Sequence, residues 1–210
     1  MATDVKPLPT DMTEDDGNQI RWAAVSGLWS FNNSSAKYLG PSQGMDSPQP
    51  YGLALTNRNL TDGIAKVRVN FSQVDTKGLI SAGLVLGFQS ERARYVLVQL
   101  GAYGRAYSVA EHVPGFGWQT IENVGSAQNL VAGKDYALEL RQLGQEVRLR
   151  VDGVSVLERL LPQPLTASQV GLFAWGKSGV SFSGLSIESA NPLVFVAMQF
   201  GSRSTHFTRR

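Results

Sequence analysis

Residues 133–156 have the sequence GKDYALELRQLGQEVRLRVDGVSV, in which apolar side chains recur at every second position. The alternating residues are Tyr136, Leu138 and Leu140 in the first half and Val147, Leu149 and Val151 in the second. Ala, Leu, Glu, Arg and Gln are good helix formers, but a period of two predicts strands with one buried face. Gly144 and the Asp152-Gly153 pair supply turn residues, and Asp-Gly favours a two-residue hairpin turn. The segment therefore predicts two consecutive β-hairpins.

The same two-residue period extends along the chain in both directions. Strands are expected over residues 65–71, 82–88, 95–100, 106–112, 118–122, 170–175 and 180–187. Residues 95–100 are apolar on both faces except for Gln99, which predicts a central strand. Gly184 separates two alternating halves that are out of phase, so a β-bulge is predicted there. Residues 32–50 are rich in Asn, Ser, Gly and Pro and are predicted to form a loop.

The composition agrees with a protein made of short strands. The chain has 210 residues, of which 42% are hydrophobic, 17% are charged and 22 are glycine. A typical soluble domain has about 25% charged residues and about 7% glycine. The length suits one domain with a sizeable core and is too short for two ordinary domains. No apolar run reaches the roughly 18 residues of a membrane helix. We therefore expect an antiparallel all-β sandwich or barrel.

The charge is unevenly distributed, although the formal net charge is only +2. Residues 1–19 hold five acidic residues and one lysine and are predicted to be a disordered acidic leader. This leader lacks the apolar segment of a signal peptide, so a cytoplasmic location is expected, with secretion as the alternative. The absence of cysteine excludes a disulfide framework and thiolate metal sites. A weakly basic body predicts no nucleic-acid partner, and no membrane association is expected.

Several motifs occur in an order typical of one superfamily. They are AGLVLGF (82–88), YVLVQLG (95–101), GFGWQTI (115–121), the hairpin segment 133–156 and QVGLFAWGKSGVSFSGLSI (169–187). In this order they resemble the concanavalin A-like lectin/glucanase jelly rolls, especially the laminin-G-like and 3-keto-disaccharide-hydrolase-like members in bacteria. The resemblance spans residues 20–190 and implies an all-β, two-sheet antiparallel jelly-roll sandwich. It implies less about function, because one such fold serves lectins, glucanases, proteases and adhesion modules.

Residues 191–210 form a separate C-terminal extension in this interpretation. Residues 193–198, LVFVAM, are apolar without alternation, which suits a strand buried on both faces. The string LVFVAMQF (193–200) resembles the first strand of TIR-like and deoxyribosyltransferase-like α/β domains. Two hypotheses remain open: an extra strand of the sandwich, or the start of an α/β effector domain. The second would make this chain the sensor part of a larger bacterial signalling or defence protein.

Catalytic residues are not expected in this sequence. Glucanases of the resembled superfamily use paired carboxylates on one strand, and no such spacing is present. Glu139 and Glu146 lie on opposite arms of a predicted hairpin, on its wet face. His112 and His206 stand apart from any recognisable nucleophile or ligand motif. The sequence therefore predicts neither an enzyme nor a metal site nor a cofactor.

Aromatic residues gather in one stretch of the chain and predict a ligand site. They are Tyr103, Tyr107, Phe116 and Trp118. Sugar rings have apolar C–H faces that stack on aromatic rings, while neighbouring polar groups bind the hydroxyls. His112 is expected to supply one such polar contact. A place in the core is the alternative for Tyr107 and Trp118. Three other aromatic residues have apolar neighbours and are assigned to the core: Trp22, Trp29 and Trp175.

Arginines supply a second candidate feature. They are Arg92, Arg94 and Arg105, together with Arg148 and Arg150 of the hairpin segment. Planar guanidinium groups pair well with carboxylates and phosphates, including those of acidic sugars. The alternative is a solvated outer face of a sheet. Together with the resemblance, these features predict a non-catalytic recognition module that binds carbohydrate. A protein-interaction or homo-oligomerisation domain is the alternative, and a glycoside hydrolase is the third hypothesis.

Overall fold

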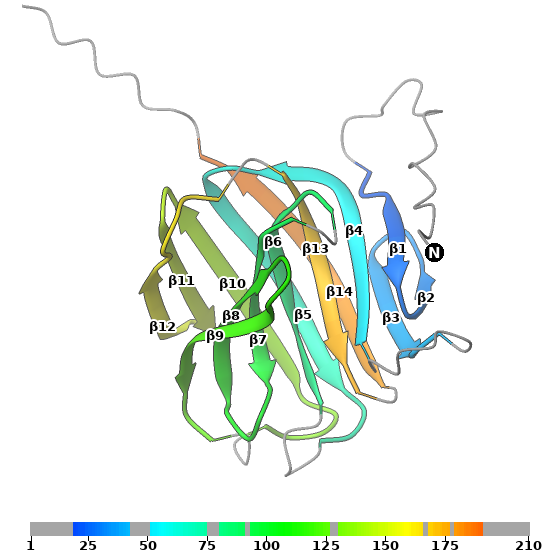
Figure 1. Ribbon diagram of the computed structural model, residues 1–210. Helices are drawn as coiled ribbons and strands as arrows, with labels where there is room; N and C mark the ends of the chain where they lie inside the picture. The colour runs from blue at the N-terminus through cyan, green and yellow to red at the C-terminus, as the bar shows by residue number, and fades with distance from the viewer. Residues whose placement is uncertain are drawn as a thin grey trace, which may run out of the picture.

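The computed structural model consists of two antiparallel β-sheets packed face to face (Figure 1). It describes residues 19–42, 51–74, 80–90, 93–126, 130–165, 168–176 and 179–190. These residues form 14 strands and contain no helix, so the all-β, two-sheet prediction is confirmed. Consequently no helix capable of crossing a membrane is found among the described residues.

Each sheet has seven strands, and strands from distant parts of the chain alternate within it. Sheet A has the order β1 (Trp22–Ser26), β4 (Tyr51–Leu60), β13 (Ser168–Trp175), β6 (Ser81–Phe88), β7 (Tyr95–Gly101), β8 (Tyr107–Val113) and β9 (Gly117–Val124). Sheet B has the order β12 (Val154–Leu160), β11 (Glu146–Val151), β10 (Asp135–Leu143), β5 (Gly63–Phe71), β14 (Val180–Ser189), β3 (Ser35–Gly40) and β2 (Leu28–Phe31).

The space between the sheets is filled by one face of each strand. On β5, the buried Ala65, Val67 and Val69 alternate with more exposed polar residues, as the period of two predicts. We call this buried layer the inter-sheet core, and its largest fully buried members are Tyr38, Phe71 and Phe182. Burial raises the pKa of Tyr38 to about 12, and its hydroxyl donates to the Gly176 carbonyl at 3.2 Å. The polar end of this buried ring is therefore satisfied.

The predicted hairpins and the predicted bulge are both present. Strands β10, β11 and β12 pair in sequence. Asp152 and Gly153 form the β11–β12 turn with φ of 50° and 81°, the left-handed values that an Asp-Gly turn accommodates. Gly184 has φ of 62° where the register of β14 shifts between Ser183 and Ser186. The bulge lets the two halves of β14 keep their different phases.

One predicted loop proves to be partly a strand. Residues 35–40 of the expected 32–50 loop form β3, in which Ala36 and Tyr38 are buried and Lys37 is exposed. This short alternation satisfies the sheet pattern although turn-forming residues surround it. Residues 43–50 lie outside the described residues, as do the C-terminal extension 191–210 and all of the leader 1–19 except Gln19.

Candidate binding site

Sheet A is apolar on both of its faces, and its outer face carries a second hydrophobic cluster. Its buried members are Leu53, Leu55, Val85, Phe88, Tyr95, Leu97 and Phe173. We call this the outer cluster, because these residues alternate with those of the inter-sheet core along the same strands. On β7 the entire sequence YVLVQLG is buried, which agrees with the predicted central position of this strand.

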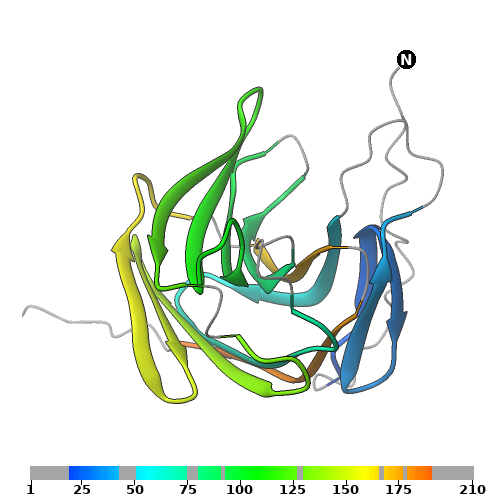
Figure 2. The ribbon, with the colours of Figure 1, turned by 90° about the horizontal axis from the view of Figure 1, so that it is seen from below.

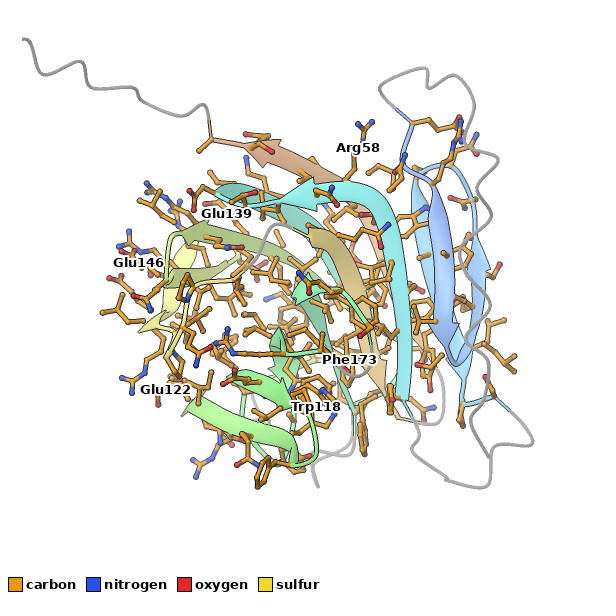
Figure 3. All side chains as sticks on the ribbon, turned by 45° about the horizontal axis from the view of Figure 1, so that its top comes forward. Arg58, Trp118, Glu122, Glu139, Glu146 and Phe173 are labelled. Carbon is orange, nitrogen blue, oxygen red and sulfur yellow. The ribbon has the colours of Figure 1, made fainter. Side chains whose placement is uncertain are left out.

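Trp118 on the edge strand β9 folds over this outer face. Its ring lies 5.3 Å from the ring of Tyr95 on β7 and 5.7 Å from that of Phe173 on β13, between centroids. Four strand spacings separate β9 from β13, which is about 19 Å in a flat sheet. Sheet A must therefore curve strongly, and the β8–β9 hairpin rises along one margin of the curve (Figure 2). Figure 3 shows Trp118 and Phe173 close together on the concave side.

A pocket of about 420 Å³ opens on this concave side, and we call it the concave pocket. It is lined by Ser81, Leu97, Gln99, Ala102, Tyr103, Ala110, Trp118, Thr120, Asn123, Phe173 and Trp175. Its volume lies at the small end of the roughly 300–1,000 Å³ typical of ligand sites. Aromatic rings together with neutral amides and hydroxyls suit an amphipathic ligand of modest size.

The aromatic wall of the pocket is held in place by stacking. The ring of Tyr51 on β4 stacks on Phe173 at 5.8 Å and on Trp175 at 6.2 Å, both residues of β13. Side chains two residues apart on one strand share a face, which places Phe173 and Trp175 side by side. Offset stacking of this kind fixes ring orientation before any ligand arrives.

The floor of the pocket contains buried polar groups. Gln99 is 4% exposed, and its register partner Ser108 on β8 is 2% exposed. Neither Gln99 Oε1 nor Ser108 Oγ has a hydrogen-bond partner among the described residues. On the other side of Gln99 the register partner is Gly83, which has no side chain.

The rim of the pocket is a tight turn with an exposed tyrosine. Residues 101–104, Gly-Ala-Tyr-Gly, all have positive φ, with 83° at Ala102 and 49° at Tyr103. The turn is closed by hydrogen bonds from Gly101 N to Ala106 O at 2.8 Å and from Arg105 N to Ala102 O at 2.9 Å. Left-handed conformation is unfavourable for residues with a Cβ, and such strain concentrates at functional sites. Tyr103 is 69% exposed despite lining the pocket.

Charged side chains are absent from the described lining of the pocket. Glu139 and Glu146 lie on β10 and β11 of sheet B, well away from Trp118 (Figure 3). They pair with Arg150 at 3.3 Å and with Arg148 at 3.2 Å, respectively. No group of three or more potential metal ligands occurs among the described residues. The described lining therefore lacks the carboxylate pair that glycoside hydrolysis uses.

The structure separates the aromatic residues predicted to bind a ligand. Tyr103 and Trp118 both line the concave pocket. His112 does not line the pocket; its ring stacks on Tyr95 at 4.6 Å and meets Trp118 edge-on at 5.4 Å. Tyr107 faces the opposite way and packs against the inter-sheet core, where burial raises its pKa. Phe116 is 79% exposed at the tip of the β8–β9 hairpin and does not line the pocket.

The predicted arginines that the structure describes do not line the pocket. Arg94 lies on the side of β7 that faces sheet B and pairs with Glu111. Arg105 is exposed in the β7–β8 turn, and Arg92 lies outside the described residues. Arg148 and Arg150 pair with glutamates on sheet B, which is the solvated-face alternative.

Of the eleven lining residues, only Tyr103 and Trp118 were predicted from the sequence, and the other nine include Trp175, Phe173 and Gln99. Trp175, assigned to the core, is half-buried and lines the pocket, and so does its strand neighbour Phe173. For Gln99, the sequence indicated only that one polar residue interrupts an apolar strand. That interruption could have marked Gln99 as a site residue, because a polar side chain in the centre of a fully buried strand needs a hydrogen-bond partner.

Comparison with known proteins identifies the architecture. No protein-family model matches the sequence. No curated protein matches it either. Among solved structures, carbohydrate-binding module CBM66 from Bacillus subtilis is similar with a TM-score of 0.64 at 15% identity, covering 82% of this chain and 98% of that one. The Bacillus licheniformis beta-glucanase has a TM-score of 0.54 at 10% identity, covering 85% and 95%.

A protein with a galectin-like fold from Bacillus subtilis is also similar, with a TM-score of 0.52 at 11% identity, covering 80% of this chain and 88% of that one. The fold is a concanavalin A-like jelly roll. At these identities the likeness concerns the fold alone. The side chains of the concave pocket, and not the fold, determine what the jelly roll binds.

Proposed function

We propose that this jelly roll is a non-catalytic module that binds carbohydrate in the concave pocket. One observation carries the proposal: aromatic rings surround a floor of neutral, buried polar groups in a small cavity. Apolar C–H faces of a sugar suit the rings of Trp118 and Trp175, and its hydroxyls suit the amide and hydroxyl groups between them. The similar carbohydrate-binding module and glucanase share the backbone and support this choice of ligand class.

The non-catalytic part of the proposal rests on the charges. Glycoside hydrolysis needs a carboxylic acid and a second carboxylate on either side of the scissile bond. The described pocket lining offers neither, and the Glu139 and Glu146 carboxylates are engaged by arginines on sheet B. We expect no release of reducing sugar from any oligosaccharide that binds. Release of reducing sugar by the purified protein at a rate above background would contradict this part.

Two exposed aromatic side chains, one tyrosine and one phenylalanine, allow a matched test of binding. Tyr103 and Phe116 both lie in hairpin turns of sheet A and are 69% and 79% exposed, but only Tyr103 lines the pocket. A panel of soluble oligosaccharides would be titrated while following tryptophan fluorescence, since Trp118 and Trp175 line the pocket. Tyr103→Ala should weaken binding about tenfold, which corresponds to about 1.4 kcal/mol of lost contact.

The control for this test is Phe116→Ala, which should leave Kd unchanged within about twofold, or roughly 0.4 kcal/mol. Neither substitution removes a buried side chain, so both variants should fold. The proposal is wrong if no oligosaccharide binds, or if the two variants bind equally well.

A further inference from the structure

The lining of the concave pocket includes Gln99, and the register partner of Gln99, Ser108, lies beside this lining on β8. Gln99 Oε1 and Ser108 Oγ have no hydrogen-bond partner among the described residues, at 4% and 2% exposure of their residues. Leaving a buried donor or acceptor unsatisfied costs about 1–3 kcal/mol. An unsatisfied amide oxygen of a lining residue, with an unsatisfied hydroxyl next to it on β8, indicates that a group from outside the fold completes them.

Their place in sheet A puts both residues on the face that carries the concave pocket. Gln99 and Ser108 are register partners on β7 and β8, and they share the outer face with Leu97 and Ala110 of the pocket lining. The register partner of Gln99 on β6 is Gly83, where an added Cβ would lie 2.8 Å from the Cβ of Gln99, so the glycine makes room for the glutamine side chain. Gln99 is the one polar side chain in the buried strand β7, whose sequence is YVLVQLG.

The remaining polar groups of the pocket are also neutral. They include the side chains of Ser81, Thr120 and Asn123, and no described lining residue carries a charge. Recognition of an acidic sugar is favoured by arginine or lysine near its carboxylate. Hydroxyl groups, in contrast, pair with neutral amides and hydroxyls without leaving a buried charge.

We propose that the concave pocket selects an uncharged sugar and that Gln99 and Ser108 determine this specificity by hydrogen bonding to its hydroxyl groups. A sugar hydroxyl donates to Gln99 Oε1, while Ser108 Oγ can accept from a second hydroxyl or donate to it. This inference rests on the proposed carbohydrate binding and adds the class of sugar and the residues that choose it.

Two variants test the roles of Gln99 and Ser108, and a third serves as a matched control. Gln99→Met keeps the approximate size of the side chain and removes its hydrogen-bonding atoms, and Ser108→Ala removes only the hydroxyl. Gln142→Met is the control, because Gln142 is 2% exposed and its Oε1 also lacks a partner, but it lies on β10 of sheet B and outside the pocket lining. Circular dichroism and thermal unfolding would establish that each variant folds.

Binding would be measured by tryptophan fluorescence with two panels of probes. One panel holds uncharged gluco-, manno-, galacto-, xylo- and fructo-oligosaccharides, and the other holds oligogalacturonates and sialyllactose. The wild type should prefer the uncharged panel, with a Kd that stays constant within about twofold up to about 0.5 M NaCl, because no charge pair is screened. Gln99→Met should raise Kd about tenfold or more, Ser108→Ala several-fold, and Gln142→Met less than about twofold.

The outcomes distinguish this inference from the function on which it rests. If acidic sugars bind better than uncharged ones, or if Gln99→Met and Ser108→Ala bind like the wild type, the inference is overturned while carbohydrate binding stands. If the wild type binds neither panel, both are overturned. If Gln99→Met does not fold, Ser108→Ala alone decides.

Discussion

Among single residues, Arg94 was predicted to bind a ligand, but it forms an ion pair within the protein. Its guanidinium pairs with the Glu111 carboxylate, and the two side chains are 21% and 11% exposed. The same guanidinium donates to the carbonyls of Gln163 at 3.3 Å and Pro164 at 3.4 Å, in the segment that follows β12. Burial lowers the pKa of Arg94 from its ordinary value. Arg94 therefore links sheet A to a segment that leaves sheet B.

Removing one member of this pair should cost more than removing both. Arg94→Leu leaves the Glu111 carboxylate largely buried without its partner, which destabilises by about 3–5 kcal/mol for a fully buried pair and somewhat less here. The double variant Arg94→Leu/Glu111→Leu should recover much of that loss. Urea denaturation of the two single variants and the double variant forms a double-mutant cycle. Equal stability of Arg94→Leu and the double variant would contradict the prediction.

Asp152 makes the free energy of unfolding depend on pH in the acidic range. The Lys134 ammonium, 2.9 Å away, lowers the pKa of Asp152 below its ordinary 3.8, helped by the hydrogen bond from Ala137 N. A carboxylate with a lower pKa in the folded state contributes stability above its unfolded pKa. That contribution is lost as the pH falls through the folded pKa. The loss therefore occurs below about pH 4.

Asp152→Asn should flatten this acid dependence. Asparagine can still accept from Ala137 N and tolerates the φ of 50° in the β11–β12 turn, but it has no charge for Lys134. Between about pH 6 and pH 3, the free energy of unfolding should fall less in the variant than in the wild type. The measurement is urea unfolding at a series of pH values. Parallel curves for the two proteins would count against it.

Among the strands, β6 shows why sheet A needs a glycine at its centre. A Cβ at Gly83 would lie 2.6 Å from the Cα of Gln99 on β7, closer than real Cβ contacts, even though its φ is unstrained. At Gly153, in contrast, φ is 81° and a Cβ would meet nothing within 4 Å. The two positions thus separate steric clash from backbone strain.

Gly83→Ala should destabilise the protein more than Gly153→Ala does. The clash at Gly83 involves backbone atoms of a central strand, so overpacking should cost about 3 kcal/mol or more. At Gly153 only the left-handed conformation is penalised, at about 1 kcal/mol. Thermal and urea unfolding of both variants measure the difference. The reverse order would show that β6 and β7 separate easily, contrary to their packing here.

The strands themselves were predictable because their signals are local. The alternation of apolar and polar residues predicted β5, β10 and β11, and Gly153 and Gly184 indicated a turn and a bulge. The strand β3 was missed because its six residues are surrounded by turn-forming residues. Alternation shows that a strand has two faces, but it does not show how strongly the sheet curves.

The pocket was only partly predictable because it depends on that curvature. Tyr103 and Trp118 were found from a local aromatic stretch, whereas Trp175 lies on β13 and reaches the pocket only through strand order. Tyr107 was included because its neighbours are aromatic, but its phase on β8 turns it toward the inter-sheet core. Contacts between β9 and β13 therefore require the structure.

Across the whole molecule, the two sheets differ in what they present to the outside. The outer face of sheet A carries the outer cluster and the concave pocket. Sheet B instead has ion pairs on its outer side, among them Lys66 with Glu188 at 3.3 Å and Arg150 with Glu139 at 3.3 Å. Exposed ion pairs contribute little to stability but keep a surface hydrated. Sheet A is therefore the side on which ligand binding can add to the stability of the fold.

A ligand in the concave pocket should stabilise the entire domain. The pocket is lined by five strands of sheet A, β6, β7, β8, β9 and β13, so a ligand that needs its shape binds the folded state only. At a concentration about 100 times Kd, such a ligand adds about 2.7 kcal/mol. For a domain of this size that raises Tm by about 5–10 °C. The probe is the oligosaccharide that gives the largest fluorescence change.

The same heating experiment separates pocket binding from weak contact elsewhere. In Gln99→Met the shift at the same sugar concentration should shrink with the weaker affinity, while in Gln142→Met it should remain. The two glutamines are similarly buried but lie in different sheets, so a general effect of sugar on protein hydration would act on both variants alike. Equal Tm shifts in both variants would place the stabilising contact outside the concave pocket.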